Sequence, residues 1–258
     1  MLFRSDVQKK AATFAQAHES GRLLILPTVW DVWSARLAVE AGFQGLTVGS
    51  HPVGDALGPG DGEAMDFAEY MAVTKRIVDA VDVPVSLDVE SGYGLAPAEL
   101  VQRVLDSGAV GLNIEDTVRR EGGRMRERDE HAQYIADARA AADQAGVDLV
   151  INGRTDALVH GTTLYEDPLA EAVERIRLLE QAGARSVYPV GLPDLNAARA
   201  MVEAVSVPVN VTAHPVNGAK AGSLAQLREL GVRRISFGPL WQAALAETSK
   251  QQLAAWTN

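Results

Sequence analysis

Short apolar runs alternate with longer segments whose apolar residues recur at helical spacing along the whole chain. Runs rich in aliphatic and β-branched residues predict strands, and the longer periodic segments predict helices. The predicted strands are residues 23–26, 45–48, 85–89, 111–114, 149–152, 186–190, 209–211 and 234–237. The predicted helices are residues 34–41, 62–81, 97–107, 127–145, 168–182, 195–205 and 223–230, with a terminal helix from about residue 240.

Strand and helix alternate eight times, which favours one α/β domain over residues 1–258. Glycines such as Gly42 and Gly108 follow the helices, where a left-handed C-terminal cap favours a residue without Cβ. Strands that are apolar throughout are typical of a parallel sheet buried on both faces, and eight of them most simply close into a (β/α)₈ TIM barrel. A doubly wound open sheet is the alternative, but residues 27–31 (PTVWD) lack the glycine-rich phosphate loop expected after its first strand.

The composition narrows the functional classes. The chain has 24 Lys+Arg against 34 Asp+Glu, a net charge of −10, which disfavours nucleic acid or an anionic membrane as partner. Zero cysteines exclude a disulfide scaffold, a thiolate metal site and a cysteine nucleophile. The first residues do not have the pattern of a signal peptide, and no apolar run approaches the ~20 residues of a membrane span. We therefore expect a soluble, cytoplasmic protein.

Polar residues follow the predicted strands at one end, where a barrel carries its chemistry. Asp88 and Glu90 are spaced by two, so in a strand both carboxylates would point to the same side. Glu115 follows the next strand and could join them. Neighbouring carboxylates repel unless a cation intervenes, and an oxygen-only ligand set suits Mg²⁺, with Mn²⁺ as an alternative.

Arg154 ends the fifth strand and is a natural partner for a substrate carboxylate or phosphate. Structural roles compete with functional ones at these positions. Asp31 could simply cap a helix, and Arg154 could form an ion pair with Asp156. His18, His131 and His160 fall in predicted helix or loop and are expected to be solvated.

The segments that carry these residues, taken together, resemble the isocitrate lyase / phosphoenolpyruvate mutase superfamily. The stretches that carry the resemblance are LPTVWD, TVGSH, GPGDGE, SLDVESGYG, LNIEDT, INGRTDA and VYPVG, in this order along residues 26–191. The resemblance implies a Mg²⁺-dependent barrel that binds a 2-oxo acid or its enol and makes or breaks a C–C or C–P bond beside it.

The resemblance also implies roles for individual residues. Asp88 would be the principal metal carboxylate, Glu90 and Glu115 outer ligands acting largely through waters, and Asp61 a further member of that network. Arg154 and the backbone of Gly49, Ser50 and His51 would receive the substrate carboxylate, with Trp30 and Asp31 flanking the pocket floor. Asn210, at the seventh strand, is a further substrate-binding candidate. The residues expected to carry the catalysis are Asp88, Arg154, Asp61 and Glu115.

The chain departs from the lyases of this superfamily after LNIEDT. Their gating loop carries a catalytic cysteine, whereas residues 117–128 form an Arg- and Gly-rich stretch that resembles a mobile lid. We therefore expect a Mg²⁺-dependent lyase or decarboxylase that cleaves a C–C bond of a small 2-oxo di-acid, with oxaloacetate the leading substrate, through a metal-stabilised enolate. The alternatives are a phosphonopyruvate hydrolase or mutase-type enzyme of C–P bonds, and a non-catalytic 2-oxo acid binding protein.

The C-terminal segment, residues 240–256, has two interpretations. The superfamily commonly forms tetramers in which a C-terminal helix packs on a neighbouring subunit, which implies a homo-oligomer, a tetramer or a dimer, with this helix swapped. The alternative is an ordinary helix that closes the barrel of its own chain.

Overall fold

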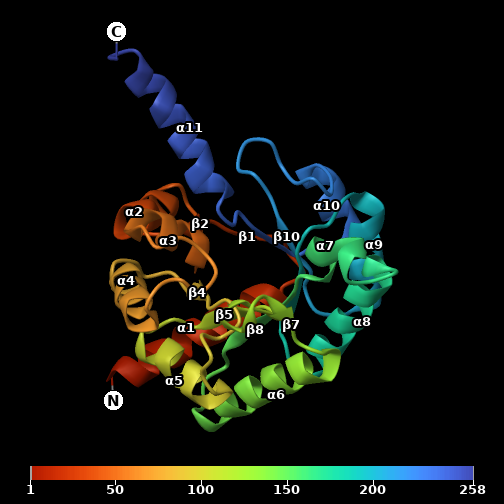
Figure 1. Cartoon of the computed structure of the whole chain (residues 1–258). Helices are drawn as coiled ribbons and strands as arrows, with labels where there is room; N and C mark the ends of the chain where they lie inside the picture. The colour runs from red at the N-terminus through yellow and green to blue at the C-terminus, as the bar shows by residue number, and fades with distance from the viewer. Residues whose placement is uncertain (1, 258) are drawn as a thin grey trace.

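A computed structural model describes residues 2–257, and its centre is a ring of eight parallel strands surrounded by helices (Figure 1). The first strand is interrupted at Pro27, which has no N–H to donate, and consists of β1 (Leu24–Leu26) and β2 (Thr28–Val29). The other seven are β3 (Leu46–Val48), β4 (Val85–Asp88), β5 (Gly111–Ile114), β8 (Val150–Thr155), β9 (Ser186–Pro189), β10 (Asn210–Thr212) and β11 (Arg234–Ser236).

The strand order closes the ring. Six strands pair in the order β2-β3-β4-β5-β8-β9, and three in the order β1-β11-β10, all parallel. The two arcs join through the β1–β2 strand on one side and through a parallel bridge between Val187 and Val209 on the other. The predicted (β/α)₈ barrel is confirmed, and the open-sheet alternative is wrong.

A helix follows every strand. Those that pack around the barrel are α2 (Val32–Glu40), α4 (Phe67–Asp79), α5 (Pro97–Asp106), α6 (Arg128–Gln144), α8 (Pro168–Gln181), α9 (Leu195–Ala204) and α10 (Leu224–Leu230). Shorter elements in the loops are α3 (Ser50–Leu57), α7 (Ala157–His160), the 3₁₀ turns η1 (Arg119–Glu121) and η2 (Gly161–Thr163), and the hairpin of β6 (Thr117–Val118) and β7 (Arg124–Met125).

Several helical details differ from the sequence prediction. The helix predicted over 62–81 begins only at Phe67, because the Asp66 carboxylate accepts the N–H of Glu69 and caps it there. Helix α3 was not predicted. Neither was α1 (Leu2–Glu19), whose Phe14 packs under the barrel, where a Cβ on Gly111 would lie only 2.8 Å from its ring.

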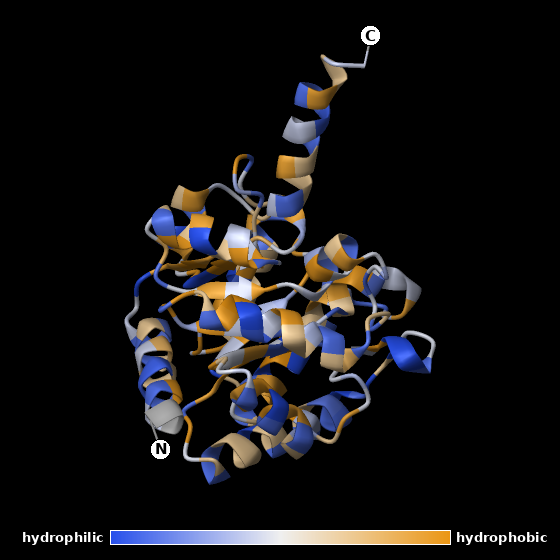
Figure 2. Ribbon diagram, turned by 90° about the vertical axis from the view of Figure 1, so that its left-hand side faces the viewer, coloured by the Kyte–Doolittle hydropathy of each residue, from blue (hydrophilic) through white to orange (hydrophobic). Residues whose placement is uncertain are grey.

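Most apolar side chains pack between the strands and the helices, in one contiguous cluster that includes Leu100, Ile135 and Ile176. Figure 2 shows these helices alternating between hydrophobic and hydrophilic faces. Terminal helix α11 (Leu240–Ala254) differs from them, because it projects away from the barrel and buries none of its residues (Figures 1 and 2). Over the described part of the chain, no helix combines the length and the apolarity needed to cross a membrane.

Candidate active site

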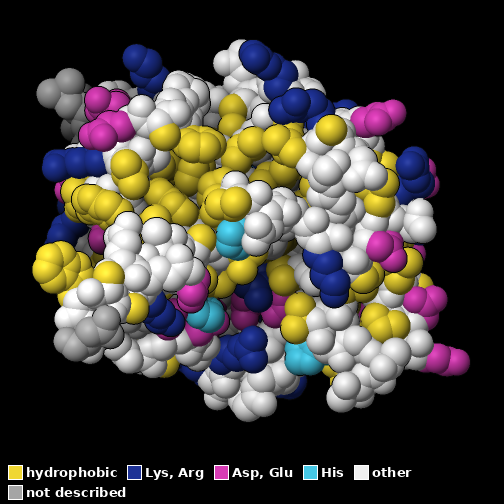
Figure 3. All heavy atoms as spheres, turned by 90° about the horizontal axis from the view of Figure 1, so that it is seen from above, with side chains coloured by type: hydrophobic (Ala, Val, Ile, Leu, Met, Phe, Trp, Pro, Cys, Tyr) yellow, Lys and Arg dark blue, Asp and Glu magenta, His cyan; other side chains and the backbone are white. Residues whose placement is uncertain are grey.

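A cavity of about 200 Å³ opens at the carboxyl ends of the strands. In the view of Figure 3, acidic, basic and histidine side chains gather around a hollow in the lower half of the surface. The predicted site residues that line the cavity are Gly49, Ser50, His51, Asp61, Asp88, Glu90, Glu115, Arg154 and Asn210. The fold thus brings together residues from five strands or the loops after them. The volume lies below the ~300–1,000 Å³ of a typical drug-sized pocket, which suits a small ligand.

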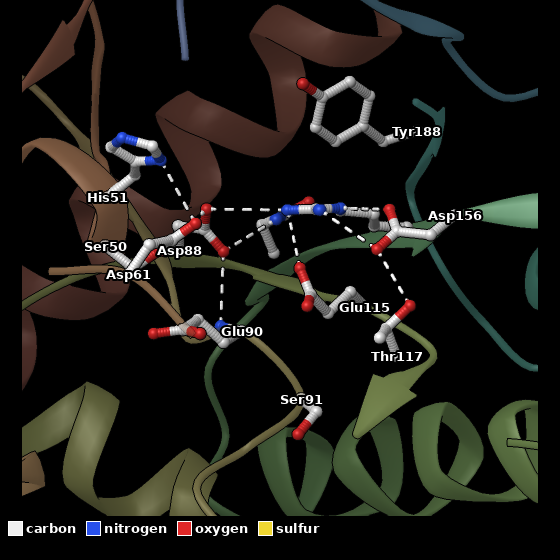
Figure 4. Close-up of polar contacts among 12 residues, drawn as sticks. Ser50, His51, Asp61, Asp88, Glu90, Ser91, Glu115, Thr117, Asp156 and Tyr188 are labelled. Carbon is white, nitrogen blue, oxygen red and sulfur yellow. Dashed lines mark hydrogen bonds and ion pairs between the residues drawn. The ribbon is translucent and has the colours of Figure 1, made fainter. Parts of the chain in front are cut away.

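Arg154, on β8, is the cationic centre of this cavity. Figure 4 shows the three acidic side chains that it contacts, Glu115, Asp88 and Asp156. The Nη1 of Arg154 lies 2.6 Å from Glu115 and 3.9 Å from Asp88, while Nε and Nη2 contact the two Asp156 oxygens at 2.8 and 3.1 Å. The ion pair with Asp156 is therefore present, and Arg154 also faces the cavity. Although burial raises the pKa of Asp156, Arg154 holds it below its ordinary value. Burial raises the pKa of Glu115 well above its ordinary value, and Arg154 opposes that rise.

Asp88 ends β4 and is connected to the site on both sides. Its Oδ1 accepts from the Asn113 amide at 2.9 Å, and its Oδ2 from the Ser50 hydroxyl at 3.4 Å. The same hydroxyl lies 3.5 Å from Asp61, so Ser50 links the two aspartates. Burial raises the pKa of Asp88, against the opposing effects of Arg154 and Asn113. A bound cation would relieve this unfavourable burial of negative charge.

Glu90 is not placed as its spacing from Asp88 predicts. The strand ends at Asp88, and Glu90 adopts a left-handed backbone with φ of 48°, so the two carboxylates do not share a strand face. Its oxygens accept from the Glu63 N–H at 2.5 Å and the Tyr93 hydroxyl at 2.9 Å. In Figure 4 its carboxylate points away from Glu115 and Asp156. Burial, with the charges of Asp88 and Asp61, raises its pKa to about 8.

The loops around Glu90 store backbone strain. Glu63, Glu90 and Tyr93 all have positive φ, a region that side chains with a Cβ rarely adopt. The conformation is held reciprocally: the Glu90 carboxylate accepts from the Glu63 backbone, while the Glu63 carboxylate accepts from the Tyr93 N–H at 2.8 Å and the Ser91 hydroxyl at 2.6 Å. Strain of this kind is characteristic of functional sites.

The N-terminus of α3 also lines the cavity, beside Asp61 and Asp88. Gly49 precedes the helix, and no side chain in the described structure caps this end, so its first N–H groups remain available to an anion. A Cβ on Gly49 would lie 2.6 Å from Thr28 Cγ2, so only glycine allows this approach. His51 is held between Asp61 at 3.1 Å and Asp55 at 3.3 Å.

The predicted lid, residues 117–128, contains the β6–β7 hairpin and η1. Arg119 lines the cavity, with its Nε 3.9 Å from Glu115. Arg120 instead lies 3.1 Å from the buried Glu63 carboxylate. The hairpin therefore supplies one arginine to the cavity and one to the strained loops beside it.

Some sequence assignments need correction. Trp30 and Asp31 are not among the residues that line the cavity: Trp30 packs edge-on against Trp241, and Asp31 caps α2 by accepting the Ser34 N–H at 2.7 Å. His18 and His131 are buried rather than solvated, and burial lowers the pKa of each to about 3. His160, the third histidine expected to be solvated, is half-buried, and the hydroxyl of Thr117 lies 3.1 Å from its ring.

The lining residues missing from the predicted site include five with larger polar or charged side chains: Asn113, Arg119, Asn152, Tyr188 and Arg234. Four of them lie within strands, where one polar residue in an apolar run was the only available signal. Tyr188 hydrogen-bonds to the Thr212 hydroxyl, and Arg234 is almost fully buried. The barrel lumen is thus polar, which periodicity alone does not reveal.

The donor set fits a hard divalent cation. Asp61, Asp88, Glu90 and Glu115 outnumber the three arginines of the cavity wall, which are Arg119, Arg154 and Arg234. Among residues 2–257, however, no three acidic or histidine side chains form a closed cluster that would hold a metal ion. A site with one direct carboxylate and several waters meets both observations, and Mg²⁺ is commonly bound in this way. Asp88, which Asn113 and Ser50 hold at the cavity wall, is the best placed direct ligand.

The phosphoenolpyruvate phosphomutase family profile matches residues 14–256, and the chain belongs to this family. The 2-methylisocitrate lyase of Escherichia coli K12 is 31% identical over 69% of this chain, and the match spans 62% of that enzyme's length. The oxaloacetate decarboxylase of Pseudomonas savastanoi pv. phaseolicola is 28% identical over 80% of this chain and 70% of its own.

Solved structures give the same family. A protein of Burkholderia cenocepacia J2315, provisionally described as a phosphonomutase, is 41% identical with a TM-score of 0.86, over 96% of this chain and 99% of its own. A 2,3-dimethylmalate lyase of the PEP mutase/isocitrate lyase superfamily is 25% identical with a TM-score of 0.84, over 95% of this chain and 87% of its own. The similar proteins include enzymes that differ in the reaction they catalyse.

Proposed function

We propose that this protein is a Mg²⁺-dependent lyase or decarboxylase of a small 2-oxo di-acid, with oxaloacetate as the leading substrate. The observation that supports this most is the convergence of Asp88, Glu115 and Arg154 with the open N-terminus of α3 on one small cavity. When bound beside Asp88, Mg²⁺ would supply Lewis-acid stabilisation of charge on the keto oxygen.

Each element of the cavity has a role in this reaction. The α3 N–H groups and Arg154 bind the carboxylate next to the keto group. Arg119 in the hairpin is available to the second carboxylate. These donors are already fixed by the fold, so they stabilise the enolate with little reorganisation.

Decarboxylation also needs no general base for the step that breaks the C–C bond. The C–C bond electrons of oxaloacetate move into the enolate as CO₂ leaves, and the enolate then takes up one proton to give pyruvate. No proton has to be removed to begin. The chain has no cysteine for the acid–base step expected of the related lyases.

The test is pyruvate release from oxaloacetate by purified protein, with Mg²⁺ and with EDTA, corrected for metal-only decarboxylation. We expect EDTA-sensitive turnover in the wild type and its loss in Asp88→Asn, which keeps an oxygen for the Asn113 bond but removes the charge. Asp79→Asn is the matched control, because Asp79 is exposed on α4 and, within the described part of the chain, forms an ion pair with Lys75 alone. Full metal-dependent activity in Asp88→Asn would contradict the metal assignment.

A C–P bond enzyme is the second candidate, supported by the 41% identity to the provisionally described phosphonomutase. A phosphonate and a carboxylate make similar demands on Arg154 and the helix terminus. Phosphonopyruvate should therefore be assayed in parallel, with phosphate release or isomerisation as the readout. If neither substrate turns over but oxalate still raises the melting temperature, the protein is a 2-oxo acid binder.

We also propose that the protein is a homo-oligomer in which α11 packs on a second copy. Helix α11 buries no residue, and Leu253 and Trp256 are 66% and 88% exposed. Figure 3 shows a broad band of hydrophobic side chains on the face of the molecule seen from the side on which α11 projects. Sedimentation of the full chain and of a variant ending at residue 239 tests this: a dimer or tetramer that the truncation dissociates is expected, and a monomeric full chain would contradict it.

A further inference from the structure

Arg234 is a buried cation without a carboxylate partner. It begins β11, is 1% exposed, and forms no ion pair with any residue in the described part of the chain. Its Nη1 contacts the Ser186 hydroxyl at 3.0 Å and His18 Nε2 at 3.1 Å. Burial lowers its pKa to about 9, which leaves it charged at neutral pH. An isolated buried charge is costly, so its surroundings require an explanation.

From Ser186, a hydrogen-bonded chain crosses the barrel lumen. The Ser186 hydroxyl lies 2.6 Å from Asn152 Oδ1, and Asn152 Nδ2 lies 3.0 Å from Asn113 Oδ1. Asn113 Nδ2 then lies 2.9 Å from Asp88 Oδ1. The strand register produces this alignment, because Asp88 pairs with Asn113, Asn113 with Asn152, and Asn152 with Ser186 across β4, β5, β8 and β9.

The groups at the two ends of this hydrogen-bonded chain fix the direction of its hydrogen bonds. Arginine can only donate, and an ionised carboxylate can only accept. Ser186 must therefore accept from Arg234 and donate to Asn152, and each asparagine must accept through its oxygen and donate through its nitrogen. Arg234 also donates to His18. Neutral His18 donates through Nδ1 to the Phe14 carbonyl at 2.8 Å, which leaves its Nε2 to accept from Arg234. Every hydrogen bond in the chain thus points from the cation to Asp88.

We infer that Arg234, Ser186, Asn152 and Asn113 form a one-way donor relay that positions the Asp88 carboxylate and stabilises its charge for cation binding. Arg234 and Ser186 act here as positioning residues, because Asn152 and Asn113 lie between them and Asp88. Bonds that point the same way polarise one another, and the lumen residues are nearly or fully buried, where a low dielectric strengthens the effect. The inference rests on the proposed role of Asp88 as the cation-binding carboxylate.

The experiment is Mn²⁺ affinity measured by electron paramagnetic resonance on the full chain without substrate. Ser186→Ala breaks the relay at its middle, and Arg234→Met removes the charge at similar volume. For each we expect ~10-fold weaker Mn²⁺ binding, the low end of the 10–100-fold effect of outer-shell partners. Arg234→Lys keeps the charge and should retain more affinity than Arg234→Met.

The matched control is Ser86→Ala. Ser86 lies on β4 and is also fully buried, but its hydroxyl has no hydrogen-bond partner among residues 2–257, so its removal should leave Mn²⁺ affinity unchanged. The double variant Ser186→Ala/Arg234→Met should lose no more affinity than the worse single variant, because both break one chain. Wild-type affinity in Ser186→Ala, an equal loss in Ser86→Ala, or additive losses in the double variant would each overturn the relay.

Asp88→Asn separates the two proposals. If it binds Mn²⁺ as tightly as the wild type, the cation site itself is misplaced. If it loses Mn²⁺ while Ser186→Ala does not, the site is supported and the relay is overturned.

Discussion

Replacing Arg154 with methionine should destabilise the protein strongly, because it leaves buried carboxylates without their cation. Arg154 is 18% exposed and lies 2.6 Å from Glu115 and 2.8 Å from Asp156, which are 3% and 1% exposed. Removing one partner of a buried ion pair costs about 3–5 kcal/mol. We expect the free energy of unfolding to fall by about this amount at pH 8.

The loss should depend on pH in a defined direction. In the wild type, Arg154 opposes the effect of burial on the pKa values of both Glu115 and Asp156. Without it both pKa values rise, so the native variant binds protons that the unfolded chain has already released between about pH 5 and 8. The free energy of unfolding of Arg154→Met then falls as pH rises. The difference in this free energy between wild type and variant should therefore be smaller at pH 5 than at pH 8.

The assay is urea unfolding followed by circular dichroism at both pH values. Arg124→Met is the control, because Arg124 also contacts two carboxylates at 2.7 Å, those of Glu121 and Glu130, but on the exposed surface. Little change is expected there. If Arg154→Met loses no more stability than this control at pH 8, or the same amount at both pH values, the buried ion-pair account is refuted.

Two further predictions concern buried groups outside the cavity wall. His131 donates through Nε2 to the Arg154 carbonyl at 3.0 Å, and burial, with the nearby charge of Arg126, lowers its pKa to about 3. The unfolded chain therefore binds a proton between pH 6.5 and 3 that the native His131 does not. The free energy of unfolding falls by up to about 1.4 kcal/mol per pH unit as pH drops through this range. His131→Gln keeps an N–H donor, so its urea unfolding between pH 4 and 7 should show a shallower pH dependence, and an unchanged slope would count against this account. Gly54→Ala should lower the melting temperature, because the new Cβ would lie 2.1 Å from the Gly60 carbonyl oxygen and overpacking of this kind costs about 1–3 kcal/mol. A higher melting temperature, as helix propensity alone predicts, would contradict this expectation.

The barrel and much of the cavity were predictable because they depend on local signals. Each apolar run gave a strand, and Asp88 and Arg154 follow from the rule that a barrel places its polar residues where strands end. Helix α1 was missed because its few apolar positions, such as Val7 and Phe14, are outnumbered by polar ones.

Long-range contacts explain the remaining differences. The orientation of Glu90 depends on a bond to the backbone of Glu63, which lies 27 residues away. The burial of His18 depends on Arg234, 216 residues further along the chain. Neither spacing nor periodicity contains these partners.

The polar lumen separates the stability of this barrel from its chemistry. Most of the apolar packing lies outside the ring of strands, between the strands and the helices, whereas asparagine, serine and arginine occupy the inside. Substitutions inside the ring can therefore adjust the charge felt by the cavity while the outer packing continues to support the fold. In evolutionary terms, such a barrel has two routes to a new activity: changing the loops that touch the substrate, or changing the lumen beneath them and leaving those loops as they are.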